Sequence, residues 1–159
     1  MEFVKSCGPY YFFITLTFGL NTSFNKRCQF TNCFLRFYNK KKFTKKFVER
    51  NHFLEGFAFF EDHPSSKFDE RIHIHILIKN NDKFAGESFD EHEADFYKVI
   101  GNVSDGKDRR VFNVECVDIR PAGDEFRINY CMKEISDRSI SDVKILTVEG
   151  LTDNVRRYE

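Results

Sequence analysis

The sequence predicts an α+β fold, with a central antiparallel β-sheet and helices packed on it. Segments rich in aromatic and β-branched residues alternate with segments whose apolar residues recur at helical spacing. In chain order they give β, α, β, β, α, β, α, which is typical of an antiparallel sheet with helices on one face. The chain has 159 residues, 41% of them hydrophobic and 20 of them phenylalanine, which favours a single domain over residues 1–159.

The first half of the chain accounts for three of the strands and one helix. The segment 10–18 is dominated by aromatic and β-branched residues, as expected of a strand. Apolar residues at helical spacing predict an amphipathic helix with a basic outer face from about 31 to 50, interrupted near Asn39. Strands over 53–61 and 71–79 are expected to pair antiparallel across the polar connection between them.

The second half is expected to alternate in the same way. A helix over 90–100 begins with acidic residues, which the helix dipole favours in a first turn. A fourth strand is expected over 111–119. Asp124 is a suitable N-cap for a final helix over 125–135, and a last strand is expected over 143–148.

The stretch 71–79 has the most informative pattern, because isoleucines alternate with histidines along it. Side chains of a strand point alternately to opposite faces, so its isoleucines are expected to face the core. His73 and His75 then share the other face, about 6.6 Å apart along the strand. Two neutral imidazoles at this spacing can bind one divalent metal ion from the same side.

A third metal ligand is expected from the neighbouring strand. Glu61 ends that strand and would lie across from the start of the histidine strand; Asp62 and His63 are the alternatives. Two imidazoles and one carboxylate leave coordination positions open for water and substrate. Such a set suits Mn²⁺ or Mg²⁺ in phosphate chemistry.

A candidate nucleophile lies on the expected final helix. Tyr130 and Lys133 are three residues apart and would share one helix face. A tyrosine can attack a phosphate covalently when a nearby cation makes the phosphorus electrophilic. Lys133 would then stabilise the phosphate oxygens or assist the leaving group.

These residues occur in the order of three known motifs. A strand containing Phe13-Ile14-Thr15-Leu16-Thr17, then His73-Ile74-His75, then Tyr130-x-x-Lys133 resembles the HUH endonucleases, and more narrowly the rolling-circle replication initiator (Rep) proteins of plasmids and single-stranded DNA viruses. The resemblance covers about residues 10–135. In this family a strand precedes the tyrosine helix, and the strand-like segment 117–121 has the matching position.

The resemblance implies an RRM-like or ferredoxin-like fold and a metal-dependent, sequence-specific nickase and joining enzyme on single-stranded DNA. Tyr130 would attack the scissile phosphate and form a 5′-phosphotyrosine linkage, leaving a free 3′-hydroxyl. The family's metal ligands fall on His73, His75 and Glu61, and its motif lysine on Lys133. The implied partner is a replication origin in single-stranded form. No helicase region with a phosphate-binding glycine loop follows in this sequence, so unwinding would need another protein or a part of the chain not present here. A separate helicase and polymerase are the expected protein partners.

Charge distribution is consistent with an anionic partner, although 25 basic and 25 acidic residues give a net charge of zero. Basic residues crowd the expected first helix and its end, where the candidate DNA-binding residues are Lys40, Lys41, Lys42, Lys45 and Lys46. A solvated helix face is the competing interpretation. Five cysteines without a CxxC pair indicate reduced thiols. No signal peptide or membrane span is expected, which favours an intracellular location: the host cytoplasm, or the nucleus of a eukaryotic host.

Two other functions remain open from the sequence. The first is a non-catalytic RRM-like nucleic-acid-binding module, in which Tyr11, Phe13, Phe57 or Phe59 would stack bases on the sheet. Such a module has no use for a converging metal site. The second is a transposase or relaxase of the same superfamily, which uses the same chemistry on different DNA. The histidines could also be two half-exposed polar residues, and Tyr130 a helix-packing aromatic.

Overall fold

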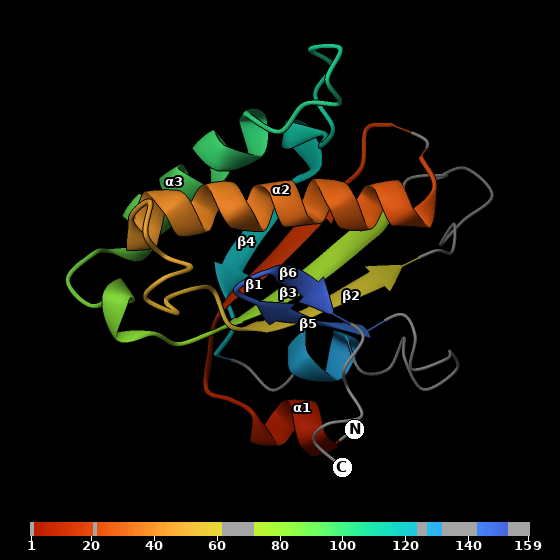
Figure 1. Cartoon of the computed structure of the whole chain (residues 1–159). Coiled ribbons are helices and arrows are strands. Elements are labelled where there is room, and N and C mark those ends of the chain that lie inside the picture. The colour runs from red at the N-terminus through yellow and green to blue at the C-terminus, as the bar shows by residue number, and fades with distance from the viewer. Residues whose placement is uncertain (1, 21, 62–71, 124–126, 132–142, 153–159) are drawn as a thin grey trace.

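A computed structural model describes residues 2–20, 22–61, 72–123, 127–131 and 143–152. They form a six-stranded antiparallel sheet in the order β4-β1-β3-β2-β5-β6, with helices packed on it (Figure 1). The strands are β1 (Tyr10–Thr17), β2 (Gly56–Glu61), β3 (His73–Lys79), β4 (Asp118–Pro121), β5 (Val143–Thr147) and β6 (Gly150–Thr152). The predicted α+β class is confirmed.

The first four strands follow the ferredoxin-like order of elements. The chain runs β1, α2 (Phe24–Phe43), β2, β3, α3 (Phe89–Gly101) and β4, which is the β-α-β-β-α-β arrangement. The hairpin β5–β6 extends the sheet beyond β2. As a result β3 and β2 are the two middle strands, and β3 pairs with β1 on one side and β2 on the other.

Alternation along β3 separates the two faces of the sheet. The isoleucines at 74, 76 and 78 are fully buried in the larger apolar cluster, with Ile14 and Leu16 of β1. Leu77 points the other way, into a smaller cluster with Phe13 and Phe57. The expected isoleucine face is confirmed, and so is the antiparallel pairing of β2 with β3.

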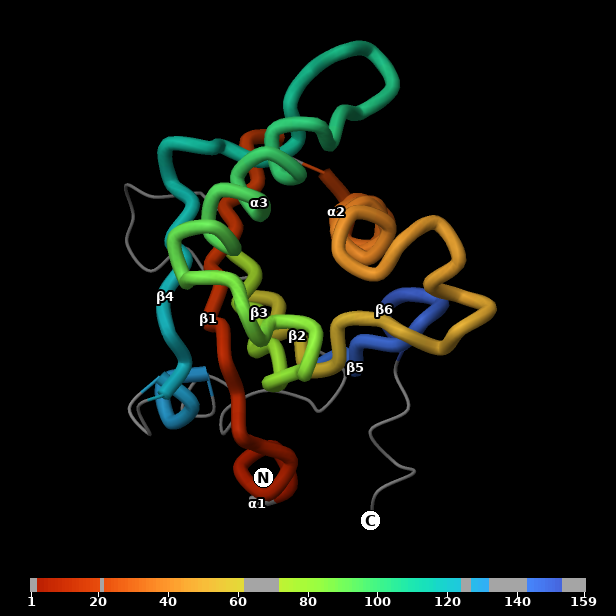
Figure 2. Tube along the Cα trace, turned by 90° about the vertical axis from the view of Figure 1, so that its left-hand side faces the viewer, coloured from red at the N-terminus to blue at the C-terminus, as the bar shows by residue number. Residues whose placement is uncertain are grey.

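Helices cover both faces of this sheet. The long helices α2 and α3 lie on the isoleucine face (Figure 2). The short helix α1 (Glu2–Ser6) and a helical turn at 127–131 lie on the other face, where Val4 and Cys131 join the smaller cluster. The prediction that helices cover one face is therefore wrong, because β1, β2 and β5 place large apolar side chains on both faces.

The first long helix is displaced toward the N-terminus from its predicted range of 31–50. It begins at Phe24 and includes Arg27 and Thr31 on its buried face, two polar residues that hide the helical pattern in the sequence. It runs without interruption through Asn39, whose side chain accepts a hydrogen bond from the backbone of Leu54. It ends at Thr44, where φ is +80°. No helix in the described part of the chain has both the length and the apolarity to span a membrane.

Other element bounds also differ from expectation. The strand predicted over 53–61 begins only at Gly56. The predicted strand 111–119 is broken by a 3₁₀ turn, Val114–Cys116, because the Asn113 side chain accepts from the Glu115 backbone; only β4 follows it. α1, a second 3₁₀ turn at Asp82–Phe84 and β6 were not predicted. Residues 127–131 are helical as expected, and the rest of the predicted final helix lies outside the described residues.

Gly56 allows β2 to lie close against β3. Its φ is +151°, and a Cβ atom at this position would come within 1.9 Å of the Leu77 carbonyl oxygen. A side chain there would push β2 away from β3 and disturb the register that pairs Glu61 with His73.

We therefore expect Gly56→Ala to lower the free energy of unfolding by more than about 3 kcal/mol, since backbone strain and overpacking add. Gly86→Ala is the matched control, because Gly86 also has a positive φ (+94°) but has open space around it. Gly86→Ala should lower the free energy of unfolding by only about 1–2 kcal/mol. Denaturant unfolding of both variants measures the difference, and equal losses would contradict a steric role for Gly56.

Candidate active site

The two histidines lie on the sheet face opposite to α2. In the register of β1, β3 and β2, His73 is flanked by Thr17 and Glu61, and His75 by Thr15 and Phe59. All of these residues share one face because paired residues on neighbouring strands point the same way. The structure thus places His73, His75 and Glu61 on one face, as the alternation of the sequence predicts.

The side chain of His75 has two polar and two aromatic contacts, and the residue is only 6% exposed. Its Nδ1 lies 3.0 Å from the Thr15 hydroxyl and its Nε2 lies 3.1 Å from a carboxylate oxygen of Glu61. Phe13 stacks on the ring at 5.4 Å, and Tyr130 meets it edge-on at 5.6 Å. These contacts fix the orientation of the imidazole and direct Nε2 toward Glu61.

The tautomer of His73 is set by Thr17. The Thr17 hydroxyl donates its single hydrogen to the carbonyl oxygen of Cys116, at 3.1 Å. The same oxygen lies 2.9 Å from His73 Nδ1, so it accepts the hydrogen bond from an Nδ1–H group. In the neutral form of His73 the lone pair is then on Nε2, and this is the form of histidine that binds a metal.

The sequence places Thr15 and Thr17 on a strand that in the resembled family lies beside the site, but it does not predict their contacts with the histidines. The available signal was the match between Thr-x-Thr on β1 and His-x-His on β3. In an antiparallel pair these motifs come face to face only in the observed register.

The donor set fits a divalent cation. Two ligands at right angles around an ion with bonds of about 2.1 Å are about 3.0 Å apart. His75 Nε2 and Glu61 Oε2 are 3.1 Å apart, so both can bind one ion with little movement. Across residues 2–61, 72–123, 127–131 and 143–152, with residue 21 excepted, no three His, Cys, Asp or Glu side chains converge as a preformed set. A three-ligand site therefore needs side-chain rotation by His73 or Glu61. Asp62 and His63 lie outside the described residues.

Tyr130 lies beside this donor set and is 41% exposed. It belongs to the helical turn at 127–131, which packs on the histidine face through its buried neighbour Cys131. Burial, with a smaller contribution from the Glu61 carboxylate, raises the pKa of the Cys131 thiol far above its ordinary value. That thiol stays protonated and is a poor nucleophile, whereas Tyr130 is accessible. Lys133 lies outside the described residues.

The five candidate DNA-binding lysines lie in the last turn of α2 and in the turn that follows it, on the sheet face opposite to the histidines. Lys42 has a side chain only 5% exposed, paired with Glu87, and its Nζ lies 3.3 Å from His92 Nδ1. Lys41 pairs with Asp95 at 2.9 Å. Lys40, Lys45 and Lys46 are exposed. These lysines do not converge with the histidines, and Lys42 is part of the packing between α2 and α3.

The aromatic residues that would form an RRM-like stacking platform are mostly buried. Phe13, Phe57 and Phe59 are at most 6% exposed and pack in the smaller apolar cluster beneath α1 and the tyrosine turn. Tyr11 is half-buried on the opposite face, where it stacks on Phe84 at 5.6 Å. Bases cannot stack on these rings as they stand, which removes the feature that favoured a binding module without a metal.

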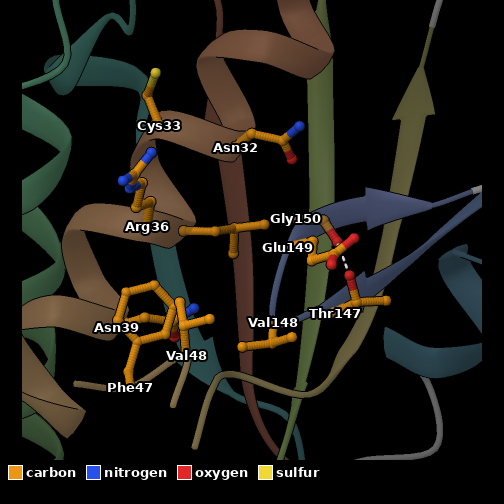
Figure 3. Close-up of a pocket in the computed structure, with 11 residues that line it drawn as sticks. Asn32, Cys33, Arg36, Asn39, Phe47, Val48, Thr147, Val148, Glu149 and Gly150 are labelled. Atoms are coloured by element: carbon orange, nitrogen blue, oxygen red, sulfur yellow. Dashed lines mark hydrogen bonds between the residues drawn. The ribbon is translucent and has the colours of Figure 1, made fainter. Parts of the chain in front are cut away.

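A cavity of about 390 Å³ lies apart from the histidines, between α2 and the turn joining β5 to β6 (Figure 3). Two of the polar side chains that line it have structural partners. Asn32 accepts from the Leu151 backbone at 2.8 Å, and Thr147 donates to the Gly150 carbonyl at 2.7 Å. None of the residues that line this cavity belongs to the histidine face.

Comparison with protein-family models, with curated proteins and with solved structures finds no match to this chain. The function of this chain is therefore inferred from the geometry of the histidine face.

The Thr17 hydroxyl yields a direct test. Thr17→Val keeps the shape of the side chain but removes the acceptor for His73 Nδ1–H, so we expect Mn²⁺ affinity to fall about 10–100-fold. Thr17→Ser should retain most of it. Isothermal titration with Mn²⁺ gives the affinities.

Thr31→Val is the matched control for the loss of a buried hydroxyl. Thr31 is also buried and donates to a backbone carbonyl, that of Arg27 at 2.9 Å, far from the histidines. It should lose stability without losing Mn²⁺ affinity. An unchanged affinity in Thr17→Val would show that the hydroxyl does not set the His73 tautomer.

Proposed function

We propose that this chain is an HUH-type endonuclease: a metal-dependent nickase and strand transferase that acts on single-stranded DNA to initiate rolling-circle replication. One observation carries the proposal. An imidazole, a carboxylate and an exposed tyrosine come from three separate parts of the chain and meet on one face of the sheet. Structural packing alone does not require this combination.

The reaction would be a transfer between two ester bonds. The Tyr130 phenol oxygen attacks phosphorus, the bond from phosphorus to the 3′ oxygen breaks, and the phenol's proton passes to the departing 3′-hydroxyl through solvent or a nearby base. The 5′ end of the downstream strand is then esterified to Tyr130. Attack by a 3′-hydroxyl on this ester reverses the exchange and joins two strands without an outside energy source.

The chain's own residues would prepare this exchange. Thr17 and Thr15 orient the two imidazoles, and Phe13 and Tyr130 confine the His75 ring. Glu61 supplies the negative charge that makes the site a cation site rather than an anion site. A divalent ion held by His73, His75 and Glu61 would polarise the scissile phosphate and stabilise the charge that develops on its oxygens.

DNA is the partner that this chemistry implies, at a replication origin exposed as a single strand. Lys40, Lys45 and Lys46 remain predicted backbone contacts of the kind that carry no sequence information. Since they lie on the α2 face, they would engage DNA at a distance from the nicking site. A separate helicase and polymerase would complete replication.

Labelled oligonucleotides can test the tyrosine. With Mn²⁺ and a pool of single-stranded oligonucleotides, 3′-labelled strands should become covalently attached to the protein, while 5′-labelled strands should be released as shorter free products. Tyr130→Phe should abolish both, because only the phenol oxygen is lost. Denaturing gels separate the two products.

Tyr97→Phe is the control for removal of a tyrosine hydroxyl away from the site, because Tyr97 lies on α3 and packs against the larger apolar cluster. Its hydroxyl donates to the Val117 carbonyl at 3.2 Å, so its loss affects local packing ahead of β4 and not the histidine face. This variant should still form the adduct. Adduct formation by Tyr130→Phe would exclude Tyr130 as the nucleophile.

A further inference from the structure

A second cavity, which we call the end cavity, lies at the end of the sheet where β1 finishes. It has a volume of about 300 Å³ and lies between the start of α2, the segment before it and the loop after α3. Cationic side chains dominate its polar lining. Lys26, Lys107 and Arg109 face a single carboxylate, that of Asp105.

The carboxylate of Asp105 is already paired with Arg109. Its carboxylate accepts from Arg109 at 2.9 Å and 2.6 Å, and also from the backbone N–H groups of Lys107 and Arg109. Lys26 and Lys107 are exposed, and neither forms an ion pair with any residue that the structure describes. The positive charges of Lys26 and Lys107 are thus not balanced by an ion pair with any described residue of the end cavity.

Two further polar groups lie at the end cavity, the Thr22 hydroxyl and the start of α2. The hydroxyl oxygen of Thr22, which lines the cavity, is buried and has no hydrogen-bond partner within the described part of the chain. The neighbouring start of α2 has no acidic residue in its first turn, and Ser23 makes no side-chain cap there. The positive end of the helix dipole is therefore not compensated by the helix's own residues.

The end cavity is close to the histidine face. Leu20 lines it and is three residues from Thr17, hence at most about 11 Å away. The Phe18 backbone donates to the carbonyl of Ile72, the residue before His73, at 3.0 Å, and Gly19 donates to Val111 at 2.8 Å. These bonds fix the cavity to the end of β3 that carries His73.

Building on the nicking function proposed above, we propose that the end cavity binds a backbone phosphate of single-stranded DNA on one flank of the scissile phosphate. The positive charges of Lys26 and Lys107 attract the phosphate. A strand bound in this way would enter the site past His73. The lysines at the far end of α2 are not needed for this contact.

The double variant Lys26→Gln/Lys107→Gln tests the proposal in the full chain. Oligothymidylate of about 20 nucleotides is a suitable probe, because backbone contacts do not depend on base sequence. Its binding is followed by fluorescence anisotropy over a range of salt concentrations, with a chelator present to prevent cleavage. Loss of this one phosphate contact should reduce the salt slope by about 0.7 and weaken binding about 5-fold at 0.1 M salt.

The matched control is Lys5→Gln/Lys83→Gln, which removes two exposed lysines at the opposite end of the sheet. It should leave both affinity and slope near the wild-type values. An unchanged slope in Lys26→Gln/Lys107→Gln, or an equal loss in the control, would overturn the proposal. If the end cavity binds only free phosphate, the salt slope of oligothymidylate binding will be unchanged in Lys26→Gln/Lys107→Gln.

The adduct assay separates this proposal from the nicking function. Wild-type adduct formation together with unchanged binding by the Lys26→Gln/Lys107→Gln variant rejects the end cavity alone. If the wild-type protein forms no adduct but the variant binds about 5-fold more weakly, the nicking function is rejected and the phosphate site is retained.

Discussion

The position of β3 between β1 and β2 is the constraint on which the rest of the structure depends. Three isoleucines of this strand are fully buried against α2 and α3, and the residues between them must face the other way. A slip of one residue would exchange the two sets and bury imidazoles in the apolar cluster. The hydrophobic face therefore fixes the register, and the register brings His75 to Thr15 and His73 to Thr17.

The histidine face shows how a polar site is maintained within a largely buried sheet surface. Burial of a polar side chain is costly unless its hydrogen-bonding groups are paired. Thr15 and Thr17 pair with Nδ1 of each ring, and Glu61 pairs with Nε2 of His75. These hydrogen bonds remove the cost of burying the polar groups, and they also orient the imidazole rings. The same contacts therefore stabilise the fold and preorganise the site. The tyrosine turn then covers the site through Cys131 and leaves Tyr130 accessible.

Local patterns were enough to predict the sheet's central strands and the shared face of His73, His75 and Glu61. Alternation is a property of a single strand, and Glu61 has the parity that a hairpin requires. The hydrogen bonds between Thr and His were not predictable in the same way, because they need the register between strands about 60 residues apart. Lys42 is a similar case: its sequence neighbours are basic, but its partners Glu87 and His92 come from another element. The start of α2 was missed because Arg27 and Thr31 occupy its buried face.

The central claim is that His73, His75 and Glu61 form one divalent-cation site next to Tyr130. Diffraction from crystals soaked in Mn²⁺, collected at a wavelength where manganese scatters anomalously, tests it most directly. The account predicts an anomalous peak about 2.1–2.3 Å from His75 Nε2 and from a Glu61 carboxylate oxygen, with His73 Nε2 as a third ligand. A fully occupied manganese site elsewhere, with the His75–Glu61 contact unchanged, would contradict it.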